Sequence, residues 1–169
     1  QGYREIGGIM GPRNTIPGEE RYNAFIEVLQ LYGLRIVREY VKEGDFSMKS
    51  GYERTWELLQ LNKQPEVVLV ANNLMGIGAL RAIRDKGLRV PQDIGLVVFD
   101  ETYVADLTDP PLTVVAQPAE EMGEIAAKCL LERIQKGDLI SPREIVLSPV
   151  LVVRGSTKRK VWGGGDTDM

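Results

Sequence analysis

Residues 67–80 read Val-Val-Leu-Val-Ala-Asn-Asn-Leu-Met-Gly-Ile-Gly-Ala-Leu, and this stretch decides the fold class. Its first part, Val67–Ala71, is apolar and mostly β-branched, which is typical of a strand buried on both faces of a parallel sheet. The residues that follow predict a helix over Leu74–Lys86, because apolar side chains recur every three to four positions and Gly87 ends the pattern. A buried strand followed at once by a helix indicates an α/β fold.

The same alternation continues on both sides of this stretch. Further apolar runs are Ile6–Met10, Ile94–Phe99 and Leu112–Ala116, and a weaker, alternating edge strand is expected at Leu34–Arg38. Helical spacing of apolar residues predicts helices at Glu19–Tyr32, Ser50–Leu61 and Pro118–Lys136. Strands that alternate with helices are joined by right-handed crossovers. We therefore expect an α/β, doubly wound parallel sheet sandwich of about five strands.

The last part of the chain differs in character. Ile145–Leu147 and Val150–Val153 predict a final extended ribbon. Pro149 stands between them and favours an edge or a crossing segment, because proline cannot donate to a central ladder. Residues 158–169 are rich in glycine and charged residues and predict a flexible tail.

Composition excludes several function classes. The chain has 169 residues, enough for about one domain, and 21 basic against 24 acidic residues give a net charge of −3. That charge argues against an intrinsic nucleic-acid surface. The chain has no histidine and one cysteine, Cys129, which excludes His-dependent triads, internal disulfides and thiolate zinc clusters. We expect no metal, no cofactor and no enzymatic activity. No signal peptide or membrane-spanning pattern is visible, and Gln1 at the start indicates a part of something longer.

Polar side chains follow the apolar runs, at the carboxyl ends where open α/β sheets bind ligands. Asn72, Asp100 and Gln117 each come after such a run, and the loop after the first run leads to Arg21. Carboxylate, amide and guanidinium groups together can grip a polyol. Phe46 lies in a predicted loop, where its ring could lie against the C–H face of a sugar.

Each of these residues also has a structural interpretation, which the sequence leaves open. Asn72 or Asn73 can cap the helix that follows, and capping is favoured more at Asn73. Asp100 can simply end a strand and begin a turn. Arg21, on the first turns of a helix, is more often solvated, and Phe46 can pack within its own loop.

Short motifs occur along the chain in an order that is specific only in combination. They are Gly11-Pro12, Arg21-Tyr22-Asn23-Ala24-Phe25, Gly44-Asp45-Phe46-Ser47, Val70-Ala71-Asn72-Asn73-Leu74-Met75-Gly76-Ile77-Gly78-Ala79-Leu80, Gly87-Leu88-Arg89-Val90-Pro91-Gln92-Asp93-Ile94, Phe99-Asp100-Glu101, Pro111-Leu112-Thr113-Val114-Val115-Ala116-Gln117-Pro118 and Leu151-Val152-Val153-Arg154-Gly155-Ser156. From about Gly2 to Thr157, the chain resembles the LacI/GalR (lactose-repressor) family of bacterial transcription regulators.

The resemblance implies one lobe of a two-lobed effector domain, similar to type I periplasmic sugar-binding proteins. It implies that a small effector, a sugar or a nucleobase-like metabolite, binds between the lobes. The positions that match the family's effector contacts are Arg21, Phe46, Asn72, Asp100 and Gln117. It further implies that DNA is bound only through a helix-turn-helix domain absent from this chain, that the protein is cytoplasmic, and that no membrane is a partner.

The resemblance also divides the chain. It assigns residues 1–116 with 144–157 to the C-terminal lobe of the effector domain and residues 117–143 to the N-terminal lobe. We therefore expect the helix at Pro118–Lys136 to expose its apolar residues Met122, Ile125 and Leu130, unless another chain or a displaced packing covers them.

The resemblance also implies a homodimer. Its contacts are expected on the helix Leu74–Arg84 and on the loop near Thr108-Asp109-Pro110.

The sequence departs from the family pattern at a few positions. Val98 stands where the family often has glycine, Asn73 where it often has aspartate, and Val114 where it has a second threonine. These departures leave the effector's identity open. A sugar-binding protein of a transport system shares the fold and is the alternative function. An enzyme of flavodoxin-like shape is disfavoured, because histidine, a phosphate loop and a reactive cysteine site are missing.

Overall fold

The computed structural model describes residues 1–102, 104–136 and 141–158. The described strands are β1 (Ile6–Met10), β2 (Val41–Glu43), β3 (Val67–Val70), β4 (Gly95–Phe99), β5 (Thr113–Ala116) and β6 (Val150–Val152). The described helices are α1 (Ile16–Leu31), α2 (Met48–Leu58), α3 (Asn73–Asp85) and α4 (Ala119–Lys136), with 3-10 turns η1 (Arg38–Tyr40) and η3 (Gly155–Thr157). All four helices predicted from the sequence are present, with ends shifted by at most three residues.

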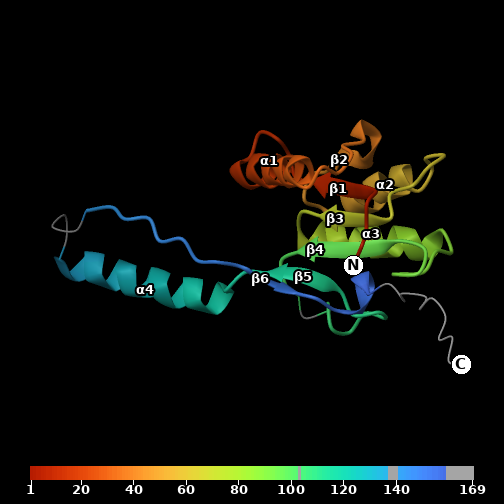
Figure 1. Cartoon of the computed structure of the whole chain (residues 1–169). Coiled ribbons are helices and arrows are strands. Elements are labelled where there is room, and N and C mark those ends of the chain that lie inside the picture. Colours follow the sequence, from red (N-terminus) through yellow and green to blue (C-terminus); the bar gives the residue numbers. More distant parts are fainter. Residues whose placement is uncertain (103, 137–140, 159–169) are drawn as a thin grey trace, which may run out of the picture.

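The strands form one sheet in the order β2-β1-β3-β4-β5-β6 (Figure 1). β1 to β5 are parallel, and β6 pairs antiparallel with β5. The predicted doubly wound α/β fold is thereby confirmed, with one strand more than expected. β6 lies at the edge of the sheet, as Pro149 before it indicated, but Ile145–Leu147 forms no strand, so the first half of the predicted ribbon is wrong.

The other edge strand is not where the sequence placed it. Leu34–Arg38 was expected to be extended, yet β2 is formed by Val41–Glu43, which pairs with Gly8–Met10. The chain turns at Gly33 (φ 62°), and the η1 turn then buries Tyr40, so the strand can begin only afterwards. Val41–Glu43 is short and largely polar, and it carries no alternation that could have identified it.

Side-chain caps fix the starts of three helices. Thr15 Oγ1 accepts from Gly18 N before α1, Ser47 Oγ accepts from Ser50 N before α2, and Asn72 Oδ1 accepts from Met75 N before α3. Each bond satisfies a backbone donor that the first turn of a helix leaves unpaired. The caps of α2 and α3 lie at the carboxyl ends of the strands, so they also fix the loops there.

One face of the sheet is fully covered by α2 and α3. Val68, Val70, Leu96 and Val98 share this face and are at most 1% exposed. The two helices pack closely, because a Cβ added at Gly78 of α3 would lie 2.1 Å from the carbonyl oxygen of Met48 in α2. This face is the main part of the core.

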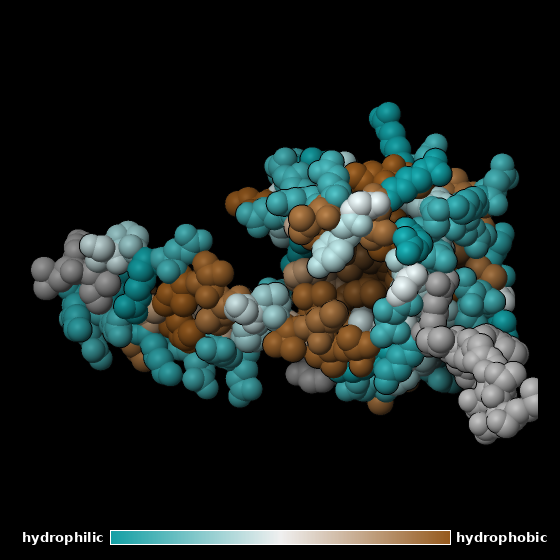
Figure 2. Space-filling model, in the orientation of Figure 1, coloured by the Kyte–Doolittle hydropathy of each residue, from teal (hydrophilic) through white to brown (hydrophobic). Residues whose placement is uncertain are grey.

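The opposite face is covered only partly, by α1. Phe25 and Leu29 of α1 pack over it, while Val97 and Phe99 of β4 stay half-buried. A hollow of about 610 Å³ with almost wholly apolar walls remains beside α1. Figure 2 shows it as the brown, hollowed area in the middle of the body.

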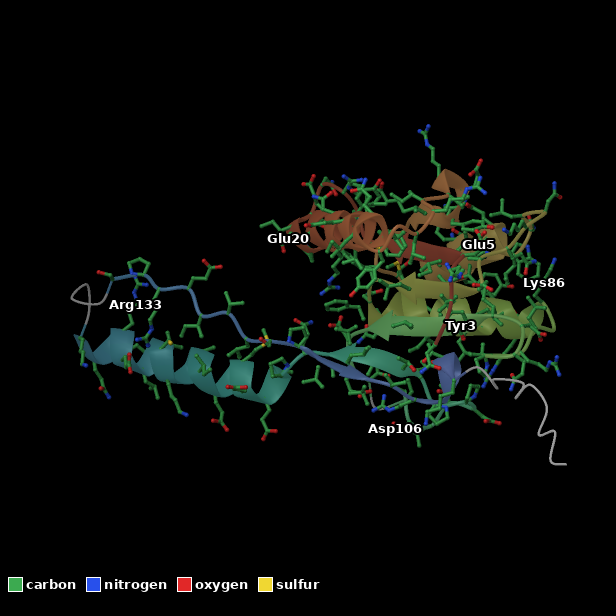
Figure 3. The ribbon with its side chains drawn as sticks, viewed as in Figure 1. Tyr3, Glu5, Glu20, Lys86, Asp106 and Arg133 are labelled. Carbon is green, nitrogen blue, oxygen red and sulfur yellow. The ribbon has the colours of Figure 1, made fainter. Side chains whose placement is uncertain are left out.

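α4 stands apart from the body. It projects beyond β5, and the chain returns beside it to β6 (Figure 1). None of its residues is buried, and Met122 (47% exposed) and Leu130 (61%) are open to solvent, as expected from the sequence, whereas Ile125 is half-buried. Beyond its first turns, the side chains of α4, including the labelled Arg133, lie clear of the body (Figure 3).

Two further findings concern the described residues. None of their helices has the length and apolar character needed to cross a bilayer. Of the predicted tail at 158–169, all but Lys158 lies outside the described residues.

Candidate functional site

Predicted site residues come together at the carboxyl edge of the sheet. Arg21 reaches this edge from α1, Asn72 follows β3, Asp100 follows β4, and Gln117 follows β5. Phe46 lies in the loop between β2 and α2. Contacts join Gln117, Asp100 and Arg21 to one another and Asn72 to Phe46, and the two groups meet at Ala71, whose carbonyl accepts from Arg21.

Asp100 is held in an unusual backbone conformation. Its φ is +75°, in the left-handed region, which aspartate tolerates better than most residues. Its backbone N–H donates to the carbonyl of Val115 at 3.0 Å, and its Oδ1 accepts a hydrogen bond from Nε2 of Gln117. Asp100 directly follows β4, so the structural interpretation, in which it ends a strand and begins a turn, is confirmed. The same turn also brings its carboxylate against Gln117.

Arg21 lies beside Asp100 and Gln117. The structural interpretation, in which Arg21 is a solvated side chain, is wrong. Its guanidinium carbon is 3.8 Å from the centre of the Phe99 ring, and its Nη1 donates to the carbonyl of Ala71. The same Nη1 is 4.0 Å from Oδ2 of Asp100. Burial lowers the pKa of Arg21, and the charge of Asp100 opposes that shift. The guanidinium of Arg21 therefore stays charged and links the residue after β3 to the residue after β4.

Asn72 is the helix cap, so the preference for Asn73 as the cap is wrong. Asn73 is the first residue of α3 itself. Besides accepting from Met75 N at 3.0 Å, the Asn72 amide donates from Nδ2 to the carbonyl of Phe46 at 2.9 Å. A side-chain amide has two N–H groups and two lone pairs, and these contacts use one of each. Capping and ligand contact are therefore compatible at Asn72.

Phe46 is fixed in its loop from two sides. Its carbonyl accepts from Asn72, and its ring lies against Gly11, where an added Cβ would be 2.0 Å from Cζ of the ring. Its own φ is +67°. The ring is half-buried, so the loop-packing interpretation holds. Only glycine at position 11 allows this approach between the loops after β1 and β2.

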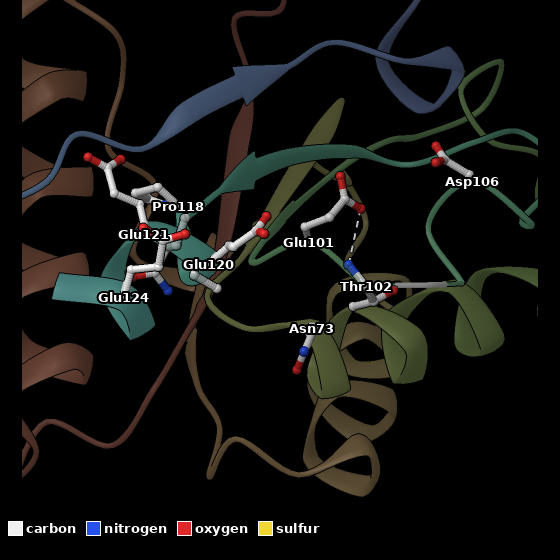
Figure 4. A pocket seen from close by; sticks show the side chains of 10 residues that line it. Asn73, Glu101, Thr102, Asp106, Pro118, Glu120, Glu121 and Glu124 are labelled. Carbon is white, nitrogen blue, oxygen red and sulfur yellow. Dashed lines mark hydrogen bonds between the residues drawn. The ribbon is translucent and has the colours of Figure 1, made fainter. Parts of the chain in front are cut away.

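A cavity of about 980 Å³ opens beside Gln117, between the loop after β4 and the first turn of α4 (Figure 4). Its walls are Asn73, Glu101, Thr102, Asp106, Gln117, Pro118, Ala119, Glu120, Glu121 and Glu124. Of these, the sequence identified only Gln117 as a site residue. Asn73 and Glu101 each stand second after an apolar run, directly behind Asn72 and Asp100, and that place was a usable signal.

Glu101 is the best-anchored carboxylate of this cavity. Both of its oxygens accept from the guanidinium of Arg154, at 3.2 and 2.7 Å. The hydrogen bonds from Arg154 lower the pKa of Glu101 and raise that of Arg154. Among residues 1–102, 104–136 and 141–158, this cavity included, no three His, Cys, Asp or Glu side chains are grouped so as to hold a metal ion. The arrangement is suited to binding through hydrogen bonds.

Comparison with known proteins identifies this architecture. A family model described as a periplasmic binding protein-like domain matches residues 1–157. The chain is 39% identical over 155 residues to the HTH-type transcriptional regulator CelR of Thermobifida fusca, covering 92% of this chain and 45% of that protein. It is 32% identical to the HTH-type transcriptional repressor CytR of Escherichia coli, covering 94% of this chain and 46% of that protein.

Solved structures agree. A complex of the regulator CelR with cellobiose superposes with a TM-score of 0.84 at 39% identity, over 92% of this chain and 47% of that one. The lac repressor dimer bound to operator and an anti-inducer gives 0.81 at 31% identity, over 92% and 46%. The chain thus spans about half the length of the relatives it matches. On this evidence the chain belongs to the periplasmic binding protein-like family, in the form that LacI-type transcriptional regulators contain.

Proposed function

We propose that this chain is the effector-binding and dimerisation portion of a LacI-type transcriptional regulator. The observation that carries the proposal is the row of contacts from Gln117 through Asp100 to Arg21. It lies at the carboxyl edge of a sheet whose strand order reverses between β1 and β3, the position where open α/β sheets bind small ligands. The regulators among its relatives favour this function over a transport protein.

The effector is a small polar molecule, a sugar or a nucleobase-like metabolite. Asp100 accepts from hydroxyl groups, Arg21 donates, and the amides of Asn72 and Gln117 can do both. Phe46 offers an apolar ring beside them. None of these contacts requires a covalent bond to form or break. The proposed site therefore binds an effector and is not enzymatic.

A second lobe completes the site. Residues 1–116 and 144–157 form the present lobe, and residues 117–143 belong to the other one. The exposure of α4, none of whose residues is buried, supports this division. Half of a cleft encloses a ligand poorly, so affinity is expected to depend on the second lobe.

Regulation follows as a shift between two lobe orientations. An effector that bridges the lobes favours one lobe orientation. In a homodimer, this change of orientation alters the relative position of the paired helix-turn-helix domains, which lie outside the present chain. The regulator acts in the cytoplasm. The surface for the dimer is α3 with the loop at Asp109. Arg84 of α3 donates from Nη2 to the carbonyl of Asp109 at 3.2 Å, so the two expected contact segments form one surface.

Calorimetry tests the proposal directly. The longer protein that contains this chain is titrated with cellobiose, glucose, glucose 6-phosphate and adenosine, and binding of at least one is expected. Asp100→Ala should abolish that binding, because a charged acceptor contributes about 1.5–3 kcal/mol per hydrogen bond. Arg89→Gln, which changes an exposed ion pair with Asp93, is the control. Unchanged affinity in Asp100→Ala removes Asp100 from the site, and catalytic turnover of any of these compounds contradicts the proposal.

A further inference from the structure

Arg154 makes a dense set of side-chain contacts close to the site. Its Nη1 and Nη2 donate to the two oxygens of Glu101 at 3.2 and 2.7 Å, and its Nε lies 2.8 Å from Oδ1 of Asp106. Nη1 also donates to the carbonyl of Leu112 at 3.0 Å. One guanidinium therefore holds both ends of the segment 101–106 and ties it to the residue before β5.

The backbone of Arg154 is itself anchored. Its N–H donates to Oγ1 of Thr113 at 2.9 Å, and the same hydroxyl lies 3.2 Å from its carbonyl oxygen. The side chain is only 18% exposed. Because the backbone of Arg154 is anchored and its guanidinium is largely shielded from water, this side chain fixes the positions of its partners more firmly than a surface ion pair does.

Asp100 lies directly before Glu101 and needs such support. Its left-handed φ of +75° is not the conformation that an aspartate adopts by default. On its amino side the backbone N–H is bound to Val115, and on its carboxyl side the next residue is bound by Arg154. Between these two attachments the Asp100 carboxylate is aimed at Gln117.

We propose that Arg154 is a positioning residue of the effector site, which holds Asp100 in the orientation that accepts from Gln117. The effector part of this inference rests on the proposed function. Arg154 stands just after β6, on the segment that returns from α4. A shift of that returning segment would therefore move the loop that carries Asp100. The position of α4 is in this way linked to the affinity for the effector.

Hydrogen exchange tests the positioning role without any ligand. The exchange rate of the Gln117 side-chain amide is measured by NMR in the 169-residue chain, with the signal assigned by its loss in Gln117→Ala. Arg154→Gln should speed this exchange by about tenfold, near the middle of the range for residues coupled through one hydrogen-bond network. Arg154→Lys keeps the charge without the fork and should fall in between. Glu101→Gln weakens the same ion pair while leaving Arg154 in place, and it should also speed the exchange of the Gln117 side-chain amide.

Two controls separate positioning from a loss of stability. Ile94→Val weakens the core at the amino end of β4, and Arg89→Gln breaks an exposed fork on Asp93 at that same end. Both should leave the Gln117 exchange rate unchanged. The inference is overturned if Arg154→Gln and Glu101→Gln also leave it unchanged, or if Ile94→Val raises it equally.

A binding measurement then separates the inference from the proposed function. Cellobiose, glucose, glucose 6-phosphate and adenosine are each titrated into the longer protein and its Arg154→Gln and Arg154→Lys variants. For each compound that binds, the affinity should fall in the same order as the exchange rate rises, and an unchanged affinity overturns the effector part. If none of these compounds binds, the proposed function fails, while the exchange result still decides whether Arg154 positions Asp100.

Discussion

The side-chain amide of Gln117 donates to the carboxylate of Asp100 across the ends of two neighbouring parallel strands. The two residues are 17 positions apart in the sequence, and β5 brings them together by returning beside β4. The carboxylate is therefore oriented before any ligand arrives. A preset acceptor loses less conformational freedom on binding than a free one.

The backbone of Asp100 yields the first prediction. Asp100→Asn should change the free energy of unfolding by less than about 0.5 kcal/mol, because asparagine tolerates a positive φ well. Asp100→Val should cost about 1–2 kcal/mol, since a side chain with a branched Cβ strains this conformation. Urea unfolding measures both. Equal stability of the two variants would contradict the left-handed conformation.

Two glycines should respond in opposite ways to alanine. A Cβ at Gly78 would lie 2.1 Å from a backbone oxygen of α2, so Gly78→Ala should destabilise the protein by about 1–3 kcal/mol. Gly123 lies in α4 with nothing within 4 Å of an added Cβ, so Gly123→Ala should strengthen that helix by up to about 1 kcal/mol. Urea unfolding and the helical signal in circular dichroism test the pair. Similar effects of the two changes would contradict the close packing of α2 and α3.

The order of elements was predictable because the central strands are buried on both faces. Runs such as Val67–Ala71 must be apolar throughout, so their composition reveals them. β2 was missed because a short edge strand needs no such composition, and its place depends on the turn after Gly33. Tertiary context decides such elements.

The candidate site was predictable in part for the same reason. Polar residues directly after buried strands stand at the ligand-binding edge in this fold class, which located Asn72, Asp100 and Gln117. The role of Arg154 could not be found this way, because its partners lie 53 and 48 positions earlier in the sequence. Nothing in local spacing pairs Arg154 with Glu101. Only the antiparallel return of β6 beside β5 brings them into contact.

Acid titration should report on the loop that holds Phe46. Hydrogen bonds from Ser47 and then Ser50 lower the pKa of the neighbouring Asp45 from 3.8 to about 2. Because the folded pKa is the lower one, Asp45 stabilises the fold above about pH 4, and this contribution is lost as the pH falls toward 2. Ser47→Ala should move the pKa of Asp45 back toward 3.8, as followed by its carboxyl carbon in NMR.

Asp93 is the internal control for that titration. Hydrogen bonds from Arg89 lower its pKa independently of Ser47, so its titration should not change in Ser47→Ala. A shift of Asp93 together with Asp45 would indicate a general loss of structure. An unchanged Asp45 would show that the Ser47 hydroxyl does not hold its carboxylate.

The last prediction concerns α4 and the division of the chain into lobes. Leu130 is 61% exposed on a helix without buried residues, so Leu130→Lys should change the stability of the body by less than about 0.5 kcal/mol. Ile83 of α3 is fully buried, and Ile83→Ala should cost about 2–5 kcal/mol. In the longer protein, a second lobe that covers α4 should make Leu130→Lys costly as well. Urea unfolding of both proteins decides the matter, because a small effect of Leu130→Lys in the longer protein would contradict the assignment of residues 117–143 to the other lobe.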